Sequence, residues 1–344
     1  MLRAAGVKAV YLVHGTFVGD DFFGIARMMQ RLSPSAAAWL RRVTKALVDR
    51  VAGDRGNYPE SLVRHLEAGI NGPQLAPIAV RRFVWSGENH HLGRFDAALR
   101  LIEHLAQQRF PAGSRVMLWG HSHGGNVFAL ASHLLYGGPE VIETLLSRCD
   151  LLLRSQRCEG GELTGGQVIS RAEAMRKLLA SQPLADVKPD FVTFGTPIRY
   201  AWCEAMPGKL LHVVSHRPRP RWPEYRAYFP PTWEELNRAT GGDYLHLIGI
   251  AGTNMQLNPL AWRALLADLR LNAVLQRGIK LRDLVRRMCR GMRVAQSGKT
   301  LLVDYGELEG NMFQHILGHA VYTYERWLPF HIALVTRELY GASQ

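Results

Sequence analysis

The 344-residue chain has few cysteines and no long apolar run, and both absences narrow the class of protein. Its four cysteines form no Cys-x-x-Cys pair and have no metal-ligand spacing, so we expect reduced thiols and no metal centre. No stretch of about 18 residues is uninterruptedly apolar, so no membrane-spanning helix is expected. The opening residues MLRAAGVKAVYLVHG lack the features of a signal peptide. We therefore expect a soluble cytoplasmic protein, exported only if a route without a Sec signal exists.

Internal repeats, low-complexity segments and nucleic-acid-binding motifs are also absent, which excludes solenoids and argues against a DNA or RNA partner. Hydrophobic residues make up 47% of the chain, too many for a disordered protein. The net charge is +13, from 42 lysines and arginines against 29 acidic residues. This charge predicts either an anionic partner or an ordinary basic surface.

Short apolar runs rich in β-branched residues alternate with longer helical patterns along the chain. This alternation predicts an α/β fold, a mostly parallel sheet flanked by helices. The expected strands are Val7–Val13, Ile78–Trp85, Val116–Gly120, Phe191–Phe194, Leu210–Val214, Leu245–Ile250 and Leu301–Asp304. The expected helices are Phe22–Leu32, Ala36–Val51, Arg94–Gln108, Asn126–Leu135, Arg171–Ser181, Pro259–Gln276, Ile279–Arg293 and Glu325–Tyr340.

Two stretches between expected strands are far longer than a strand-to-helix crossover needs. Residues 17–79 are expected to form a helical insertion in a single domain that spans residues 1–344. Residues 217–300 begin with RPRPRWPEYRAYFPPTW, an irregular segment rich in proline, arginine and aromatic residues. Long segments of this kind often cover binding sites, so this second insertion is expected to be a cap or lid.

The strongest chemical signal is the pentapeptide Gly120-His121-Ser122-His123-Gly124. It follows an apolar strand and precedes a helical pattern, the context that the Gly-x-Ser-x-Gly nucleophile elbow requires. The sharp turn exposes the Ser122 hydroxyl, and side chains at positions 120 and 124 would collide with neighbouring backbone. The helix N-terminus beneath it would place partial positive charge near a developing oxyanion.

His14-Gly15-Thr16 stands at the end of the first expected strand. In hydrolases with such an elbow, this loop supplies one N–H of the oxyanion hole, and the residue after the nucleophile supplies the other. We therefore expect the backbone N–H groups of Thr16 and His123 to fill these two roles, with Phe17 a neighbour that could share the first.

A base is expected near the end of the chain, because elbow hydrolases have the order serine, acid, histidine. His319 is the preferred candidate, since Gly318 before it permits a tight loop. His331 falls within the last expected helix, where a packed or surface histidine is the simpler interpretation. His315 and His319 are four residues apart, as two metal ligands on a helix can be, but no His-Glu-x-x-His motif accompanies them.

The sequence resembles the α/β-hydrolase superfamily, and within it the lipase- and esterase-like branch. The matching segments are VYLVHGT at 10–16, FVWSGEN at 83–89, LWGHSHGGN at 118–126, DFVTFGTPIR at 190–199 and ILGHAVYTYERW at 316–327. The resemblance implies Ser122 as nucleophile, His319 as base, and the N–H groups of Thr16 and His123 as the oxyanion hole.

The acid of the triad is where the sequence departs from the family pattern. The resemblance places it after the strand that precedes the last one. If Leu245–Ile250 is that strand, the following turn offers only Asn254; if Leu210–Val214 is, the first acid is Glu224. We expect Asp304, at the end of the last strand, to orient His319. The alternatives to it are Glu204 and Asp243.

More than half of the net charge lies between residues 261 and 300, which contain ten lysines and arginines and only two aspartates. Leucine, valine and methionine recur at helical spacing over 281–292, with arginines between them. Such a helix can lie on an anionic membrane or pack on the protein with a solvated basic face.

Together these features predict a serine hydrolase that cleaves carboxylic esters through an acyl-serine intermediate and needs no cofactor or metal. The expected substrate is a small-molecule or lipid ester, and phospholipids are among the candidates. Two alternatives are a catalytically weak hydrolase-fold module that binds an anionic membrane or an acidic partner, and an acyltransferase that uses the same acyl-serine. The oligomeric state cannot be predicted from these residues.

Overall fold

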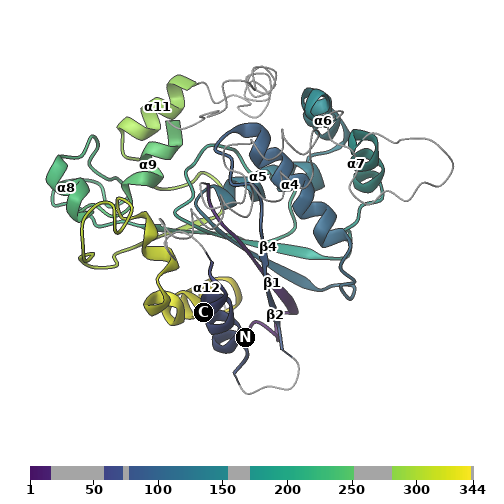
Figure 1. The fold of residues 1–344 in the computed structure, drawn as a ribbon, viewed down its shortest axis with the longest axis horizontal. Coiled ribbons are helices and arrows are strands. Elements are labelled where there is room, and N and C mark those ends of the chain that lie inside the picture. The colour runs from purple at the N-terminus through teal and green to yellow at the C-terminus, as the bar shows by residue number, and fades with distance from the viewer. Residues whose placement is uncertain (17–57, 73–76, 154–170, 252–280, 342–344) are drawn as a thin grey trace, which may run out of the picture.

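The structure, a computed structural model, describes residues 1–16, 58–72, 77–153, 171–251 and 281–341. At its centre is a six-stranded, all-parallel sheet with the strand order β2-β1-β3-β4-β5-β6 (Figure 1). The strands are β1 (Val7–Val13), β2 (Ala79–Phe83), β3 (Arg115–His121), β4 (Lys188–Phe194), β5 (Leu210–Ser215) and β6 (Lys299–Val303). The α/β class and the parallel sheet are confirmed.

Six of the seven expected strand runs are strands, because buried parallel strands read as continuous apolar segments. The run Leu245–Ile250 is the exception. It lies in the helix α9 (Tyr244–Ala251), most of whose side chains are buried. A short helix that is apolar nearly all round shows no helical periodicity, so it cannot be distinguished from a buried strand by pattern.

Helices cover both faces of the sheet. One face carries α4 (His91–Ala106), α5 (His123–Tyr136), α6 (Pro139–Leu153) and α7 (Arg171–Ala180). The other carries α3 (Glu60–Asn71) and α12 (Leu328–Tyr340), which lie on the opposite side of the strands in Figure 1. Leu99, Phe128 and Phe191 belong to the first core, and Leu12, Trp119 and Val335 to the second; all six are buried. No helix in the described part of the chain is both long and apolar enough to cross a bilayer.

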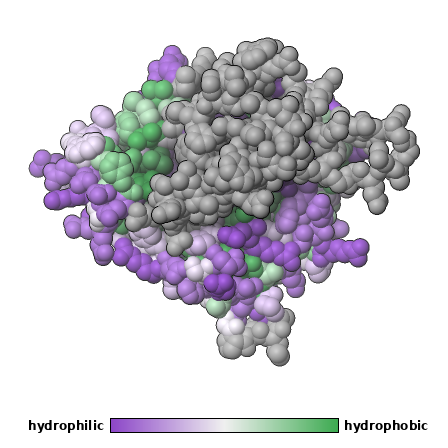
Figure 2. Space-filling view, viewed as in Figure 1, coloured by the Kyte–Doolittle hydropathy of each residue, from purple (hydrophilic) through white to green (hydrophobic). Residues whose placement is uncertain are grey.

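The described part of the second expected insertion contains α8 (Trp233–Arg238), α9 and α11 (Leu281–Cys289). Tyr244, Leu247 and Leu284 form a small core of their own there. Figure 2 shows hydrophobic residues gathered on the surface over α9 and α11. The helices expected over 22–32, 36–51 and 259–276 lie outside the described residues.

The carboxylate of Asp190 organises the amino-terminal edge of the sheet. It is fully buried and accepts hydrogen bonds from the Arg115 guanidinium at 2.6 and 2.5 Å and from the Lys209 N–H at 2.8 Å. The Tyr340 hydroxyl also donates to it, at 2.5 Å. This network ties the end of α12 to β3 and β4, far along the strands from their carboxyl ends.

Candidate active site

Ser122 occupies a strained turn between β3 and α5. Its φ of 54° and ψ of −131° lie in a region that non-glycine residues adopt at a cost of about 1–3 kcal/mol. A Cβ on Gly124 would lie 2.5 Å from the Val13 carbonyl oxygen, and one on Gly120 would lie 2.6 Å from the Phe128 ring. Only glycines fit these two positions, as the motif predicts.

Two further side chains hold the turn that carries Ser122. The Thr196 hydroxyl donates to the Ser122 carbonyl oxygen at 2.7 Å, so the Gly-Thr-Pro segment after β4 braces the elbow directly. On the other side, the ring of His121 packs against the ring of His319, with their centroids 4.6 Å apart. Its Nε2 lies 3.1 Å from the His319 carbonyl oxygen. His319 therefore lies beside the residue that precedes the nucleophile.

His319 is paired with a buried carboxylate, that of Asp243. Its Nδ1 lies 2.7 Å from Asp243 Oδ2, and because a carboxylate only accepts, Nδ1 carries the proton. The other ring nitrogen, Nε2, therefore presents a lone pair. This atom is buried and has no hydrogen-bond partner within the described ranges. A neutral histidine oriented in this way can accept a proton from a hydroxyl.

The Asp243 carboxylate is fully buried and held by several donors besides His319. Asp243 Oδ1 accepts the His246 N–H at 2.9 Å, and Oδ2 accepts the Tyr322 hydroxyl at 3.0 Å. Burial alone would raise the pKa of this carboxyl group. The His319 charge and hydrogen bond, with His246 and Arg293, outweigh burial and lower the pKa to about 2. Asp243 is therefore ionised at any physiological pH.

Two glycines with left-handed backbone bring Asp243 and His319 together. Gly242 has a φ of 92°, and a Cβ there would lie 2.4 Å from the Ser215 carbonyl oxygen at the end of β5. Gly318 has a φ of 87°, and a Cβ there would lie 2.4 Å from the Gly242 carbonyl oxygen. The backbones before Asp243 and His319 are thus stacked on each other and on the sheet. This supports the preference for His319 on the ground of its preceding glycine.

The contact expected between Asp304 and His319 is not made. The Asp304 side chain is 49% exposed and accepts from Arg217 Nε at 3.2 Å and from the Gly306 N–H at 2.8 Å. It thus closes the turn after β6 and pairs with a surface arginine. Asp243, one of the two alternatives, makes the contact instead.

The remaining carboxylate candidates do not reach the site. Glu204 and Glu224 are both exposed, and Asn254 lies outside the described residues. The signal that could have identified the acid is Gly242-Asp243 itself. It was obscured because 27 residues separate Asp243 from the end of β5 and because the apolar run after it resembled a strand.

The loop after β1 lies directly against Ser122. A Cβ on Gly15 would be 2.6 Å from Ser122 Cβ and 3.2 Å from its Oγ. The N–H groups of Thr16 and His123 have no hydrogen-bond partner in the described part of the chain. The His123 N–H is free because it belongs to the first turn of α5. These are the two backbone donors that the sequence predicts for an oxyanion.

His14 fixes the orientation of this loop, a role that the sequence reasoning missed. Its Nε2 accepts the Trp85 N–H at 3.2 Å, so Nδ1 carries the proton and donates to the Gly15 carbonyl at 2.8 Å. The Trp85 indole N–H donates to the His14 carbonyl at 2.9 Å. In a trans peptide the N–H points away from the preceding carbonyl, so the Thr16 N–H is directed away from His14.

The side chain of His123 is buried in a polar cluster under the elbow. Its Nδ1 lies 3.0 Å from Asn126 Nδ2 and 3.4 Å from Arg94 Nη1, and because arginine only donates, Nδ1 is the acceptor. Burial, followed by the charges of Arg94 and Arg199, holds the pKa of His123 well below 6.5. The ring is therefore neutral, with its proton on Nε2.

The two competing histidines have structural partners. His315 Nδ1 accepts the Gly318 N–H at 3.0 Å, and its Nε2 donates to the Asn237 carbonyl at 3.0 Å. His331 is buried and lies 2.8 Å from the Tyr305 hydroxyl. Within the described ranges, no three His, Cys, Asp or Glu side chains are grouped as metal ligands would be.

No family model matches the chain, and no curated protein or solved structure matches it. The chemistry of the site is therefore argued from its residues.

Proposed function

We propose that the chain is a serine hydrolase of the α/β-hydrolase type that cleaves carboxylic esters through an acyl-Ser122 intermediate. The observation that carries this proposal is the joint placement of Ser122 on a strained elbow and of a buried Asp243–His319 pair beside it. The backbone N–H groups of Thr16 and His123, which have no partner among the described residues, complete the set that acyl transfer requires.

The chemistry follows from the hydrogen-bonding state of each group. Ser122 Oγ attacks the ester carbonyl carbon while His319 Nε2 takes its proton, and the oxyanion receives the Thr16 and His123 N–H groups. The carbonyl re-forms as the alkoxide leaves with the proton from His319. Water, deprotonated by the same nitrogen, then attacks the acyl-serine, and the acyl–Oγ bond breaks as His319 returns that proton to Ser122 Oγ and the carboxylic acid leaves. Asp243 stays ionised and stabilises the imidazolium at each step.

The order of the residues along the chain also supports the α/β-hydrolase assignment. Serine, acid and histidine follow one another as Ser122, Asp243 and His319, the order typical of that superfamily. With Asp243 as the acid, the departure from the family pattern disappears, because Asp243 follows β5 and β5 precedes the last strand.

For the substrate, we propose esters with an apolar acyl chain, lipids included, as in the lipase- and esterase-like branch that the sequence resembles. The segment between β5 and β6 is the proposed cap or lid. A panel of p-nitrophenyl esters of increasing acyl length, together with phospholipids, tests this class. A preference for longer acyl chains supports it, and hydrolysis of acetyl esters alone contradicts it.

Labelling by a fluorophosphonate probe tests the reaction itself. We expect the wild-type protein to be labelled at Ser122 and to hydrolyse esters, and the Ser122→Ala variant to do neither. Ser132 offers a matched control, because its hydroxyl is buried in α5 and donates to the Ala129 carbonyl at 2.7 Å. The Ser132→Ala variant should still be labelled. Full ester hydrolysis by Ser122→Ala would contradict the proposal.

A further inference from the structure

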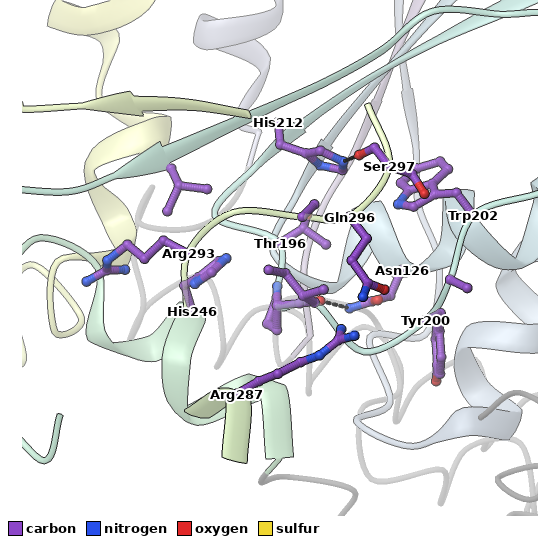
Figure 3. A pocket seen from close by; sticks show the side chains of 15 residues that line it. Asn126, Thr196, Tyr200, Trp202, His212, His246, Arg287, Arg293, Gln296 and Ser297 are labelled. Carbon is purple, nitrogen blue, oxygen red and sulfur yellow. Dashed lines mark hydrogen bonds between the residues drawn. The ribbon is translucent and has the colours of Figure 1, made fainter. Parts of the chain in front are cut away.

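A small cavity lies on the α5 side of the sheet, beside the triad but separate from Ser122 and His319. Its volume is about 40 Å³, space for about three water molecules. It is bounded by the loop after β4, by β5, by α9 and α11, and by the segment that precedes β6 (Figure 3). None of its fifteen lining residues is an aspartate or glutamate.

The His246 side chain lines this cavity without any partner of its own. It is fully buried, and neither Nδ1 nor Nε2 has a hydrogen-bond partner within the described ranges. Leaving a buried polar group unpaired costs about 1–3 kcal/mol, so an unpaired imidazole in the wall of a cavity favours a polar occupant that the ring can reach. His212, on the opposite wall, differs because its ring pairs with the Thr193 hydroxyl and the Ser297 carbonyl.

The positive charge at the cavity comes from α11. Figure 3 shows the Arg287 side chain reaching from this helix toward Asn126 and Tyr200. Arg287 is half-buried, and its guanidinium makes no hydrogen bond or ion pair with the described residues. Arg293 adds to the positive field, although its guanidinium turns away to the carbonyls of Gly241 and Asp243. Exposed Gln296 completes the lining on the solvent side.

We propose that this cavity binds a small oxyanion of the phosphate class, held by the Arg287 guanidinium and the His246 ring. Among the described residues, Arg287 has no counter-ion, the His246 ring is unpaired and no carboxylate lines the cavity, which together favour an anion over a cation or an alkyl chain. The volume limits the ligand to one phosphate-sized group. The group is either free phosphate or the phosphomonoester end of a substrate. Only the second possibility rests on the proposed hydrolase function.

The site is connected to the triad through the backbone, because the His246 N–H donates to Asp243 Oδ1. An anion on the His246 ring would thus be bound by the same residue whose N–H contacts Asp243, the proposed acid that orients His319. Occupancy of the cavity is expected to be sensed at the triad through this contact.

Isothermal titration calorimetry with inorganic phosphate at constant ionic strength tests the proposal without any enzyme assay. We expect saturable binding of one phosphate per chain, weakened roughly tenfold to a hundredfold in Arg287→Met, because a charge-assisted hydrogen bond is lost. Arg287→Lys keeps the charge and should bind with intermediate affinity. Arg286→Met is the matched control, since Arg286 is on the same helix, pairs with Asp283 at 3.6 Å and does not line the cavity.

The absence of saturable heat in the wild type would overturn the proposal, as would equal affinities in Arg287→Met and the wild type. Water would then be the only occupant. Thermal melts of each variant check that the fold is retained.

An activity experiment then separates the two sources of the phosphate group. If the substrate supplies it, inorganic phosphate should raise KM for a phosphorylated ester and leave KM for a neutral ester unchanged. If free phosphate is the ligand, KM for the two esters should respond equally. A protein without esterase activity that still binds phosphate through Arg287 would contradict the function but keep the site.

Discussion

The Tyr322 hydroxyl donates to Asp243 Oδ2, the same oxygen that receives the His319 N–H. The two contacts measure 3.0 and 2.7 Å, and the Tyr322 oxygen in turn accepts the Ser215 N–H at 2.7 Å. Tyr322 thus connects the triad acid to the end of β5. Burial, with the nearby Asp243 charge, raises the pKa of Tyr322, so its hydroxyl stays protonated and remains a donor.

Replacing Tyr322 by phenylalanine therefore removes one of the donors that hold Asp243 and leaves the Ser215 N–H unpaired. We expect the free energy of unfolding to fall by about 1–3 kcal/mol and kcat to fall by less than about tenfold, because the Asp243–His319 contact survives. Urea unfolding and ester kinetics measure the two effects. An unchanged free energy of unfolding would contradict the bridging role.

The carboxylates of Asp243 and Asp304 can be compared directly by the same substitution. Asp243→Asn should lower kcat by about three to four orders of magnitude, since an amide no longer selects the His319 tautomer. Asp304→Asn should change kcat less than about tenfold, because Asp304 contacts Arg217 and the turn after β6. Kinetics on one ester substrate suffices. The opposite ranking would make Asp304 the acid.

Two glycines with left-handed backbone provide a matched test of the stacking below the triad. Gly318 and Gly306 have φ values of 87° and 75°, but only at Gly318 would a Cβ meet the Gly242 carbonyl oxygen. Gly306→Ala should cost about 1–2 kcal/mol from backbone strain and leave kcat within twofold. Gly318→Ala should cost more and lower kcat at least tenfold, because His319 is displaced. Equal effects in the two variants would mean that the stacking does not position His319.

Buried histidines make the fold sensitive to acid, and four of them add to the effect of His123. Burial lowers the pKa of His212 and His216 to about 4, and of His246 and His331 to about 3. These values lie below the ordinary 6.5, so the unfolded chain binds more protons than the folded one as pH falls below 6.5. The free energy of unfolding should thus be nearly constant between about pH 7.5 and about pH 9, above which the raised pKa of Tyr322 lowers it again. Below pH 6.5 its slope should approach about 1.4 kcal/mol per pH unit for each histidine.

Urea titrations at several pH values measure that slope. A flat profile between pH 7 and pH 5 would contradict it. Asp243 adds a further loss only below about pH 4, because its pKa is lowered in the folded state.

The basic face of α11 predicts binding to anionic membranes. Neutralising Arg286 and Arg290 to glutamine should weaken binding to vesicles that contain phosphatidylglycerol by roughly tenfold or more at low salt. Binding to pure phosphatidylcholine should not change.

The double substitution Arg64→Gln and Arg100→Gln is the control, because it removes the same charge from other helices and should have little effect. Equal weakening by both pairs would assign the effect to net charge. Arg293, the last residue of the helix expected over 279–293, is buried and therefore unavailable for contact with a membrane.

The sequence was sufficient for the sheet and for the elbow, because these features depend on local residues. Strand β3 is a buried apolar run, and Ser122 stands in a motif whose glycines have a steric reason. The acid depends on tertiary structure instead. Asp243 reaches His319 only because a long excursion returns to β5, and no local pattern encodes that return. The cavity beside α11 could not be predicted either, since its walls come from five separate stretches of the chain.

The polar network around Asp190 lies at the amino ends of the strands, whereas Ser122, Asp243 and His319 gather at their carboxyl ends. The Asp190 network and the proposed triad therefore have no residue in common. A protein engineer could strengthen the hydrogen bonds among Arg115, Asp190 and Tyr340 to raise the melting temperature without changing any residue of the proposed triad. Substitutions that alter substrate selectivity could in the same way be made at the carboxyl ends of the strands while the Asp190 network is kept intact.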